Sequence, residues 1–151
     1  MLRVTRLTDY ATLLLKLLAV SPETVLSASQ MAEQTRLELT TVSKVLKPLA
    51  QAGLIDGLRG VNGGYRLARD AEAIRLIDIV EAMEGPLEMT ECSGEHSRCE
   101  HQPHCGLTMH WRRINDVIGD ALRDVTLAQM LAPAARMTLP PRRIAAQLTP
   151  L

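Results

Sequence analysis

The sequence contains no phenylalanine, and aromatic residues make up only 2% of its 151 positions. Any hydrophobic core therefore has to be built from aliphatic side chains, which dominate the 46% of the chain that is hydrophobic. Leucine, alanine and methionine favour helices over a β-sandwich or β-barrel. A chain of this length can bury one modest core. We therefore expect a single, mainly α-helical domain with an extension.

Long apolar runs are also missing. No segment approaches the roughly 18 consecutive apolar residues of a membrane-spanning helix. The N-terminal segment carries Arg3, Arg6, Asp9 and Lys16 and has no small-residue cleavage site of the kind that ends a secretory signal. We therefore expect a cytoplasmic protein without a membrane partner.

The chain has no net charge at pH 7, which by itself argues against nucleic-acid binding. The charges are unevenly distributed, however. Residues 1–70 carry nine Lys or Arg and six Asp or Glu, residues 71–105 carry two and eight, and residues 106–151 carry six and three. The neutral total thus conceals a basic N-terminal part, and a basic surface is what phosphate binding requires.

The N-terminal part has the pattern of a helix-turn-helix. Apolar periodicity predicts helices over residues 7–20, about 28–35, from Thr40 or Thr41 to near Gly53, 78–83 and 107–131. The second helix follows a capping box formed by Ser27 and Gln30. Two short helices, a turn of about four residues and a third helix with a polar outer face are typical of a helix-turn-helix, although a plain three-helix core has the same pattern.

A predicted hairpin favours the DNA-binding interpretation. Residues 54–59 and 65–68 have the pattern of short strands, and the glycine-rich segment 60–64 between them predicts a turn. Such a hairpin after a helix-turn-helix is a wing. A glycine-rich loop can also hold nucleotide phosphates, but no Gly-Lys-Ser/Thr follows it here. We therefore expect a winged helix-turn-helix.

This fold predicts two sets of DNA contacts. The third helix would enter the major groove, and the wing would touch the backbone or the minor groove. The expected contacts are Thr40, Thr41, Ser43, Lys44 and Lys47 in the helix and Arg59, Asn62 and Tyr65 in the wing.

Residues 107–131 have the pattern of one long amphipathic helix. Its apolar stripe is too long for its own small domain to cover, so a second copy of the chain is the expected partner. Residues 132–151, with Pro140-Pro141 and Arg142-Arg143, have the composition of a flexible tail.

Cys92, Cys99 and Cys105 follow the spacing C-x6-C-x5-C, and residues 92–110 also contain all four histidines, namely His96, His101, His104 and His110. An odd number of cysteines without a secretion signal does not suit a disulfide framework. So many soft ligands in 19 residues predict a metal-binding loop rather than incidental exposed side chains.

The sequence leaves the metal open. Zinc sites usually contain ligand pairs two to four residues apart, and no C-x2-C is present, although cysteine and histidine together could supply four zinc ligands. Longer gaps between three thiolates favour an iron-sulfur cluster, either 2Fe-2S or 4Fe-4S, with carboxylate or imidazole as a further ligand. The missing C-x2-C motif also argues against a thiol redox enzyme.

Over residues 1 to about 131 the sequence resembles the small winged-helix iron-sulfur regulators of the IscR and NsrR type, including regulators of cluster assembly of the SUF type. The matching motifs are Leu7-Thr-Asp-Tyr-Ala11, Ala52-Gly-Leu54, Arg59-Gly60 with Gly63-Gly64-Tyr65, and the three cysteines before Trp111. The resemblance implies a homodimer with a long exchanged C-terminal helix. It also implies a transcription regulator, not an enzyme, that senses cluster status or redox and nitric oxide stress.

The fourth ligand does not transfer cleanly from this resemblance. IscR-type regulators have a histidine three residues after the last cysteine, where this chain has Thr108, and His104 and His110 are shifted from that position. NsrR-type regulators use an aspartate from the first helix of the other protomer, which corresponds to Asp9 of the partner subunit.

The sequence as a whole predicts a DNA-binding domain over 1–84, a metal-cluster loop over 85–106, a dimerisation helix over 107–131 and a tail over 132–151.

Overall fold

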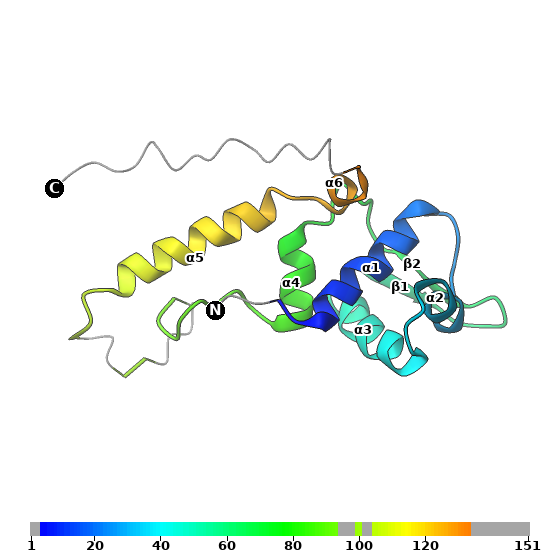
Figure 1. The fold of residues 1–151 in the computed structure, drawn as a ribbon, viewed down its shortest axis with the longest axis horizontal. Coiled ribbons are helices and arrows are strands. Elements are labelled where there is room, and N and C mark those ends of the chain that lie inside the picture. The colour runs from blue at the N-terminus through cyan, green and yellow to red at the C-terminus, as the bar shows by residue number, and fades with distance from the viewer. Residues whose placement is uncertain (1–3, 94–98, 101–103, 134–151) are drawn as a thin grey trace.

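The computed structural model of the chain describes residues 4–93, 99–100 and 104–133. Its elements are helices α1 (Arg6–Val20), α2 (Ala28–Thr35) and α3 (Leu39–Gln51), strands β1 (Ile55–Leu58) and β2 (Gly64–Leu67), and helices α4 (Leu76–Glu84), α5 (Thr108–Arg123) and α6 (Leu127–Leu131). Figure 1 shows α1, α2, α3 and the hairpin gathered on one side of α4, whereas α5 extends on the other side. The predicted mainly helical fold with a small β-hairpin is confirmed.

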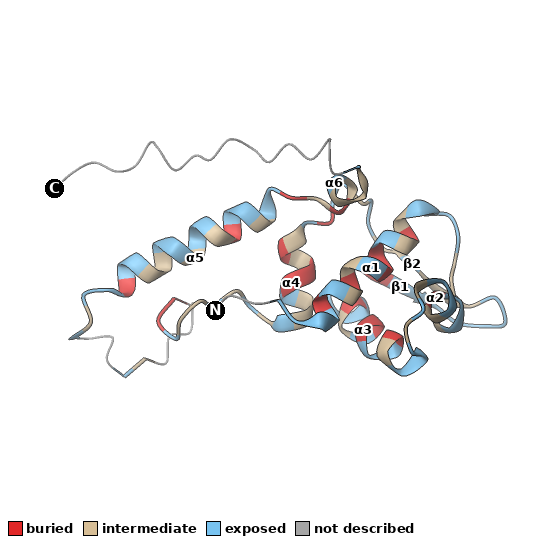
Figure 2. Cartoon of the chain, viewed as in Figure 1, coloured by how far each residue is buried: buried red, intermediate tan, exposed pale blue. Residues whose placement is uncertain are grey.

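Helix α1 forms the centre of the core because its apolar residues recur at helical spacing. Ala11, Leu14, Leu15 and Leu18 are all buried on one side of this helix. They pack in one cluster with the apolar side of α3, which consists of Val42, Val45, Leu46 and Leu49. Figure 2 shows buried positions (red) along both helices.

Helices α2 and α3 form the predicted helix-turn-helix. The capping box is present: the Gln30 amide donates to Ser27 Oγ (3.2 Å), and the Ser27 amide donates to Gln30 Oε1 (2.8 Å). Helix α2 ends at Thr35, and the next residue, Arg36, has a left-handed backbone (φ 57°) that turns the chain towards α3.

The predicted cap of the third helix is wrong by two or three residues. Glu38 is the N-cap residue, and it makes no side-chain capping bond. Because the Val42 amide already donates to the Glu38 carbonyl (3.0 Å), the helix begins at Leu39. Thr40 and Thr41 therefore lie inside the first turn of α3 rather than in front of it.

The wing has a third extended segment beside it. Strands β1 and β2 pair antiparallel, with Ile55 opposite Leu67 and Leu58 opposite Gly64. In addition, Leu26 and Tyr65 exchange two backbone hydrogen bonds of 3.0 and 2.8 Å. The segment before α2 therefore pairs with the outer edge of β2.

The prediction of one helix over residues 107–131 is wrong. Helix α5 ends at Arg123, and the Thr126 hydroxyl and Gln129 form a capping box that starts α6. Between the two helices the backbone pairs with the segment before α4: the Leu76 amide donates to the Val125 carbonyl (2.8 Å) and the Leu127 amide to the Ile74 carbonyl (2.9 Å). These distant partners replace helical hydrogen bonds, and Leu127 is fully buried in the winged-helix core.

Candidate nucleic-acid interface and cysteine loop

The outer face of α3 is polar and open to solvent. Thr40, Ser43, Lys44 and Lys47 are exposed, and Thr41 is half-buried. These positions lie opposite the buried apolar side of the helix, so packing against α1 fixes which side chains point outwards. The predicted contacts of the recognition helix therefore share one accessible face.

The wing places its three predicted DNA contacts differently. Arg59 and Asn62 are exposed in and beside the turn. Tyr65 is half-buried and packs against the core cluster, and a Cβ added at Gly57 would lie only 3.5 Å from its ring. Tyr65 thus holds strand β2 of the wing against the core, whereas Arg59 and Asn62 are exposed to solvent.

The three cysteines are free thiols in the loop between α4 and α5. Cys92 is buried, with an exposed fraction of 7%, and Cys99 and Cys105 are half-buried. A tight turn orders the first of them: Ser93 Oγ donates to the Thr90 carbonyl (2.8 Å), and Thr90 Oγ1 lies 3.3 Å from Cys92 Sγ.

Helix α5 anchors both ends of this loop. The Met89 amide donates to Asn115 Oδ1 (3.1 Å), and Arg112 Nε donates to the Cys92 carbonyl (3.4 Å). At the other end, the Thr108 hydroxyl donates to the Cys105 carbonyl (3.4 Å). The conformation of the loop and the position of α5 are therefore mechanically linked.

Within residues 4–93, 99–100 and 104–133, no three side chains of His, Cys, Asp or Glu converge as a metal site would require. His96 and His101 lie outside the described residues, as does the predicted tail from residue 134 onwards. The other candidate ligands, Asp9 in the first turn of α1, His104 and His110, are exposed. The three-thiolate site remains a prediction.

A polar contact that the sequence did not reveal joins the start of this loop to the start of α1. Glu84, the last residue of α4, accepts hydrogen bonds from the Thr5 amide (3.0 Å), the Thr5 hydroxyl (2.7 Å) and the Thr8 hydroxyl. The Thr5 and Thr8 hydroxyls hold the pKa of the Glu84 carboxyl below its ordinary value of 4.5. No local signal predicts this contact, because Thr5 and Glu84 are 79 positions apart.

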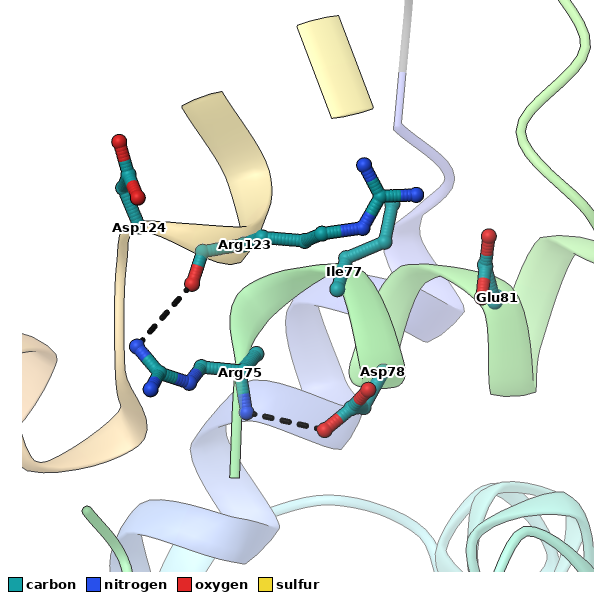
Figure 3. Close-up of a pocket in the computed structure, with 6 residues that line it drawn as sticks. All are labelled: Arg75, Ile77, Asp78, Glu81, Arg123 and Asp124. Atoms are coloured by element: carbon teal, nitrogen blue, oxygen red, sulfur yellow. Dashed lines mark hydrogen bonds between the residues drawn. The ribbon is translucent and has the colours of Figure 1, made fainter. Parts of the chain in front are cut away.

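Charged residues also line a hollow of about 430 Å³ between α4 and the end of α5. Figure 3 shows that Arg75 bridges its wall: Nη1 donates to the Arg123 carbonyl (3.2 Å), while the Arg75 amide donates to Asp78 Oδ2 (3.1 Å). The remaining lining residues are Ile77, Glu81 and Asp124. The polar groups of this hollow thus fasten α5 to the winged-helix domain.

The fold and sequence together match a known class of regulators. Residues 4–133 match the Rrf2 family, described as "Iron-dependent Transcriptional regulator". The chain belongs to the Rrf2 family. One relative, the HTH-type transcriptional regulator NsrR of Shouchella clausii, is 37% identical over 108 residues, which span 70% of this chain and 72% of NsrR.

Solved structures of this class have the same fold. CymR, the global cysteine regulator of B. subtilis, is 26% identical with a TM-score of 0.65, and the match covers 87% of this chain and 97% of CymR. IscR of T. potens is 28% identical with a TM-score of 0.63, covering 91% and 93% of the two chains. The predicted family and the winged-helix fold are confirmed.

Membership of the Rrf2 family makes this chain a DNA-binding transcription regulator rather than an enzyme, as the sequence predicted. Among the described residues, no helix has the length and apolarity needed to cross a membrane.

Proposed function

We propose that this Rrf2 protein is a cytoplasmic, homodimeric regulator in which a cluster held by Cys92, Cys99 and Cys105 alters the fit of two winged helices to operator DNA. The observation that carries the proposal is the attachment of the cysteine loop to α5 through Asn115 and Arg112. The same helix presents exposed apolar side chains that suit a second copy of the chain.

The homodimer is supported by the surface of α5. Ile114, Val117, Ile118 and Ala121 recur at the spacing of one helix face, and Ile114 and Val117 are 42% and 49% exposed. Figure 2 shows α5 exposed along most of its length. A stripe of this kind is covered most simply by the same stripe of a second copy across a two-fold axis.

The donor chemistry of the loop fits an iron-sulfur cluster. All three thiols are free, and thiolates are the ligands that such clusters use. When bound, a cluster with only three thiolates supplies an iron that reacts with oxygen, nitric oxide or exchanging ligands. The family description as iron-dependent supports iron over zinc.

Asp9 of the partner subunit is the fourth ligand that we favour over His104 and His110. Asp9 is exposed in the first turn of α1, and its amide donates to the Thr5 carbonyl (3.3 Å). Thr5 in turn is held by Glu84. The backbone that carries the Asp9 carboxylate is therefore anchored, while the carboxylate itself is open to a partner subunit.

The route from the loop to DNA runs through hydrogen bonds of this chain. Asn115 and Arg112 hold the loop backbone on α5, and Arg75 holds the end of α5 on the winged-helix domain. A change in the loop therefore changes the angle at which each domain is carried. Because two recognition helices must match half-sites one helical turn apart, such a change alters affinity.

The test is to purify the full-length protein without oxygen, measure its iron, acid-labile sulfide and zinc, and compare loaded and unloaded protein on one duplex at one salt concentration. We expect iron and sulfide, a visible absorption band, and at least a fivefold difference in affinity. Cys92→Ser, Cys99→Ser and Cys105→Ser should each lose the band, and Asp9→Asn should shift it while His104→Gln and His110→Gln leave it unchanged.

Three results would contradict the proposal. Zinc without sulfide would identify a winged-helix repressor with a structural zinc site. Equal affinity of loaded and unloaded protein would remove the sensing role. A monomer in analytical ultracentrifugation at micromolar concentration would exclude the homodimer.

A further inference from the structure

The tip of the wing has an unusual residue at its corner. The Gly63 amide donates to the Gly60 carbonyl (3.0 Å), which closes a β-turn with Val61 and Asn62 at its two central positions. Such positions usually hold Pro, Asp, Asn, Ser or Gly, whereas a β-branched valine favours extended backbone. Asn62 follows this rule and Val61 does not.

Val61 does not contribute to the hydrophobic core. Its exposed fraction is 105%, the largest among the exposed large hydrophobic residues of the described part of the chain. Because Val61 stays exposed to water, folding removes none of its apolar surface from solvent, and a polar residue would suit the turn better. A residue that is unfavourable for its local backbone and adds nothing to the stability of the fold points to a role in binding.

The tip is also slender. A Cβ at Gly63 would lie 2.4 Å from the Leu58 carbonyl oxygen, and one at Gly64 would lie 2.5 Å from the Leu26 carbonyl oxygen, so close backbone approach requires both glycines. With Gly60 on the other side of the corner (φ 115°), only Val61 and Asn62 carry side chains at the end of the wing. The end of the hairpin is therefore little wider than its backbone.

A slender apolar tip beside an arginine fits the minor groove of DNA. This groove is about 6 Å wide, and deoxyribose rings form its apolar walls. Arg59 next to the tip is exposed and is attracted by the negative potential of a narrow groove. In Figure 1 the turn projects from the end of the molecule opposite α5, beyond α2 of the helix-turn-helix.

We propose that Val61 enters the minor groove of operator DNA, packs against the sugar walls and supplies a part of the affinity that does not depend on salt. The proposal rests on the DNA binding of the proposed function and extends it to a contact between the wing tip and apolar surface. Apolar side chains of other DNA-binding proteins also enter the minor groove, where they insert between base steps.

Apolar and ionic contacts differ in their response to salt, and this difference gives the test. The wild-type full-length protein first selects its preferred duplex from a random pool of 30-base-pair DNA. The dissociation constant for that duplex is then measured at three salt concentrations for wild type, Val61→Ser, Val61→Ile and Arg59→Ala. Thermal unfolding of each variant checks the fold.

We expect Val61→Ser to weaken binding roughly three- to tenfold at every salt concentration, with the same slope of log K against log salt as wild type. Val61→Ile should keep the affinity within about twofold, because the side chain stays apolar and β-branched. Arg59→Ala should reduce the slope by about one per wing. All three should melt at the wild-type temperature, since both positions are exposed.

A modified duplex locates the contact. Replacing adenine by 2,6-diaminopurine adds an amino group to the minor groove and leaves the major-groove pattern unchanged. At the wing site this change should weaken wild type more than Val61→Ser. Equal losses for both proteins, wild-type affinity of Val61→Ser, or a loss for Val61→Ser that disappears as salt rises would each overturn the inference. If the wild type selects no duplex, the proposed function itself fails.

Discussion

Replacing Glu84 by alanine tests the contact that joins the cysteine loop to α1. The substitution removes three hydrogen bonds from the first turn of α1, which has no side-chain cap of its own. Hydrogen bonds to a charged group are worth about 1.5–3 kcal/mol each when desolvated. Glu84 is exposed, so solvent reduces this to the range of a helix cap, about 1–2 kcal/mol in total. The melting temperature should fall by roughly 2–8 °C.

The contribution of Glu84 to the free energy of unfolding depends on pH. The pKa of the Glu84 carboxyl is lower in the folded chain than its ordinary value of 4.5, so the carboxylate form is favoured by folding. Its contribution to stability is fully present above the unfolded pKa and is lost as the pH falls through the folded pKa. The difference in free energy of unfolding between wild type and Glu84→Ala should therefore be largest near about pH 7 and shrink towards about pH 3.

Urea unfolding followed by circular dichroism at several pH values measures this difference. Glu81→Ala is the matched control, because Glu81 is also exposed on α4 and accepts no hydrogen bond from α1 among the described residues. Glu84→Gln should fall between wild type and alanine, since its amide oxygen still accepts but carries no charge. Equal stability of the Glu84 and Glu81 variants, or a difference that persists at low pH, would refute the reasoning.

Three further predictions concern single positions. Lys44→Ala should weaken duplex binding in a gel shift and reduce its salt slope by about one per recognition helix at unchanged melting temperature; normal affinity would exclude a phosphate contact. Gly64→Ala should cost about 1–3 kcal/mol, because its Cβ would meet the Leu26 carbonyl, whereas Gly106→Ala, with open space around it, should unfold in urea like wild type. Leu127→Ala should destabilise by about 2–5 kcal/mol in the same assay; a loss below 1 kcal/mol would show that α6 is not part of the core.

The elements that could be predicted are those with local causes. Leu14, Leu15 and Leu18 follow helical spacing, and Ser27 with Gln30 forms a capping box over three residues. The glycines around Val61 likewise predict the turn that the Gly63–Gly60 hydrogen bond closes. For these segments the free-energy preference lies in neighbouring residues, so a short window of sequence contains it.

The break between α5 and α6 could not be predicted from the local sequence pattern. The sequence does contain a capping box at Thr126 and Gln129, yet the apolar period runs through it and predicts a continuous helix. What decides the break is the pairing of Val125 with Leu76 and the burial of Leu127 in a core that only exists once the domain has folded. Tertiary partners here outweigh the helical pattern.

The candidate site divides in the same way. Sequence alone identified the thiols Cys92, Cys99 and Cys105 and the polar face of the recognition helix, because residue type and spacing define what a side chain can bind. Only the tertiary structure brought Glu84 to Thr5 and tied the loop to Asn115, since such contacts join positions far apart in the chain. The ligands that a segment can bind are determined by its own residues, whereas the contacts that couple one element to another depend on how the whole chain folds.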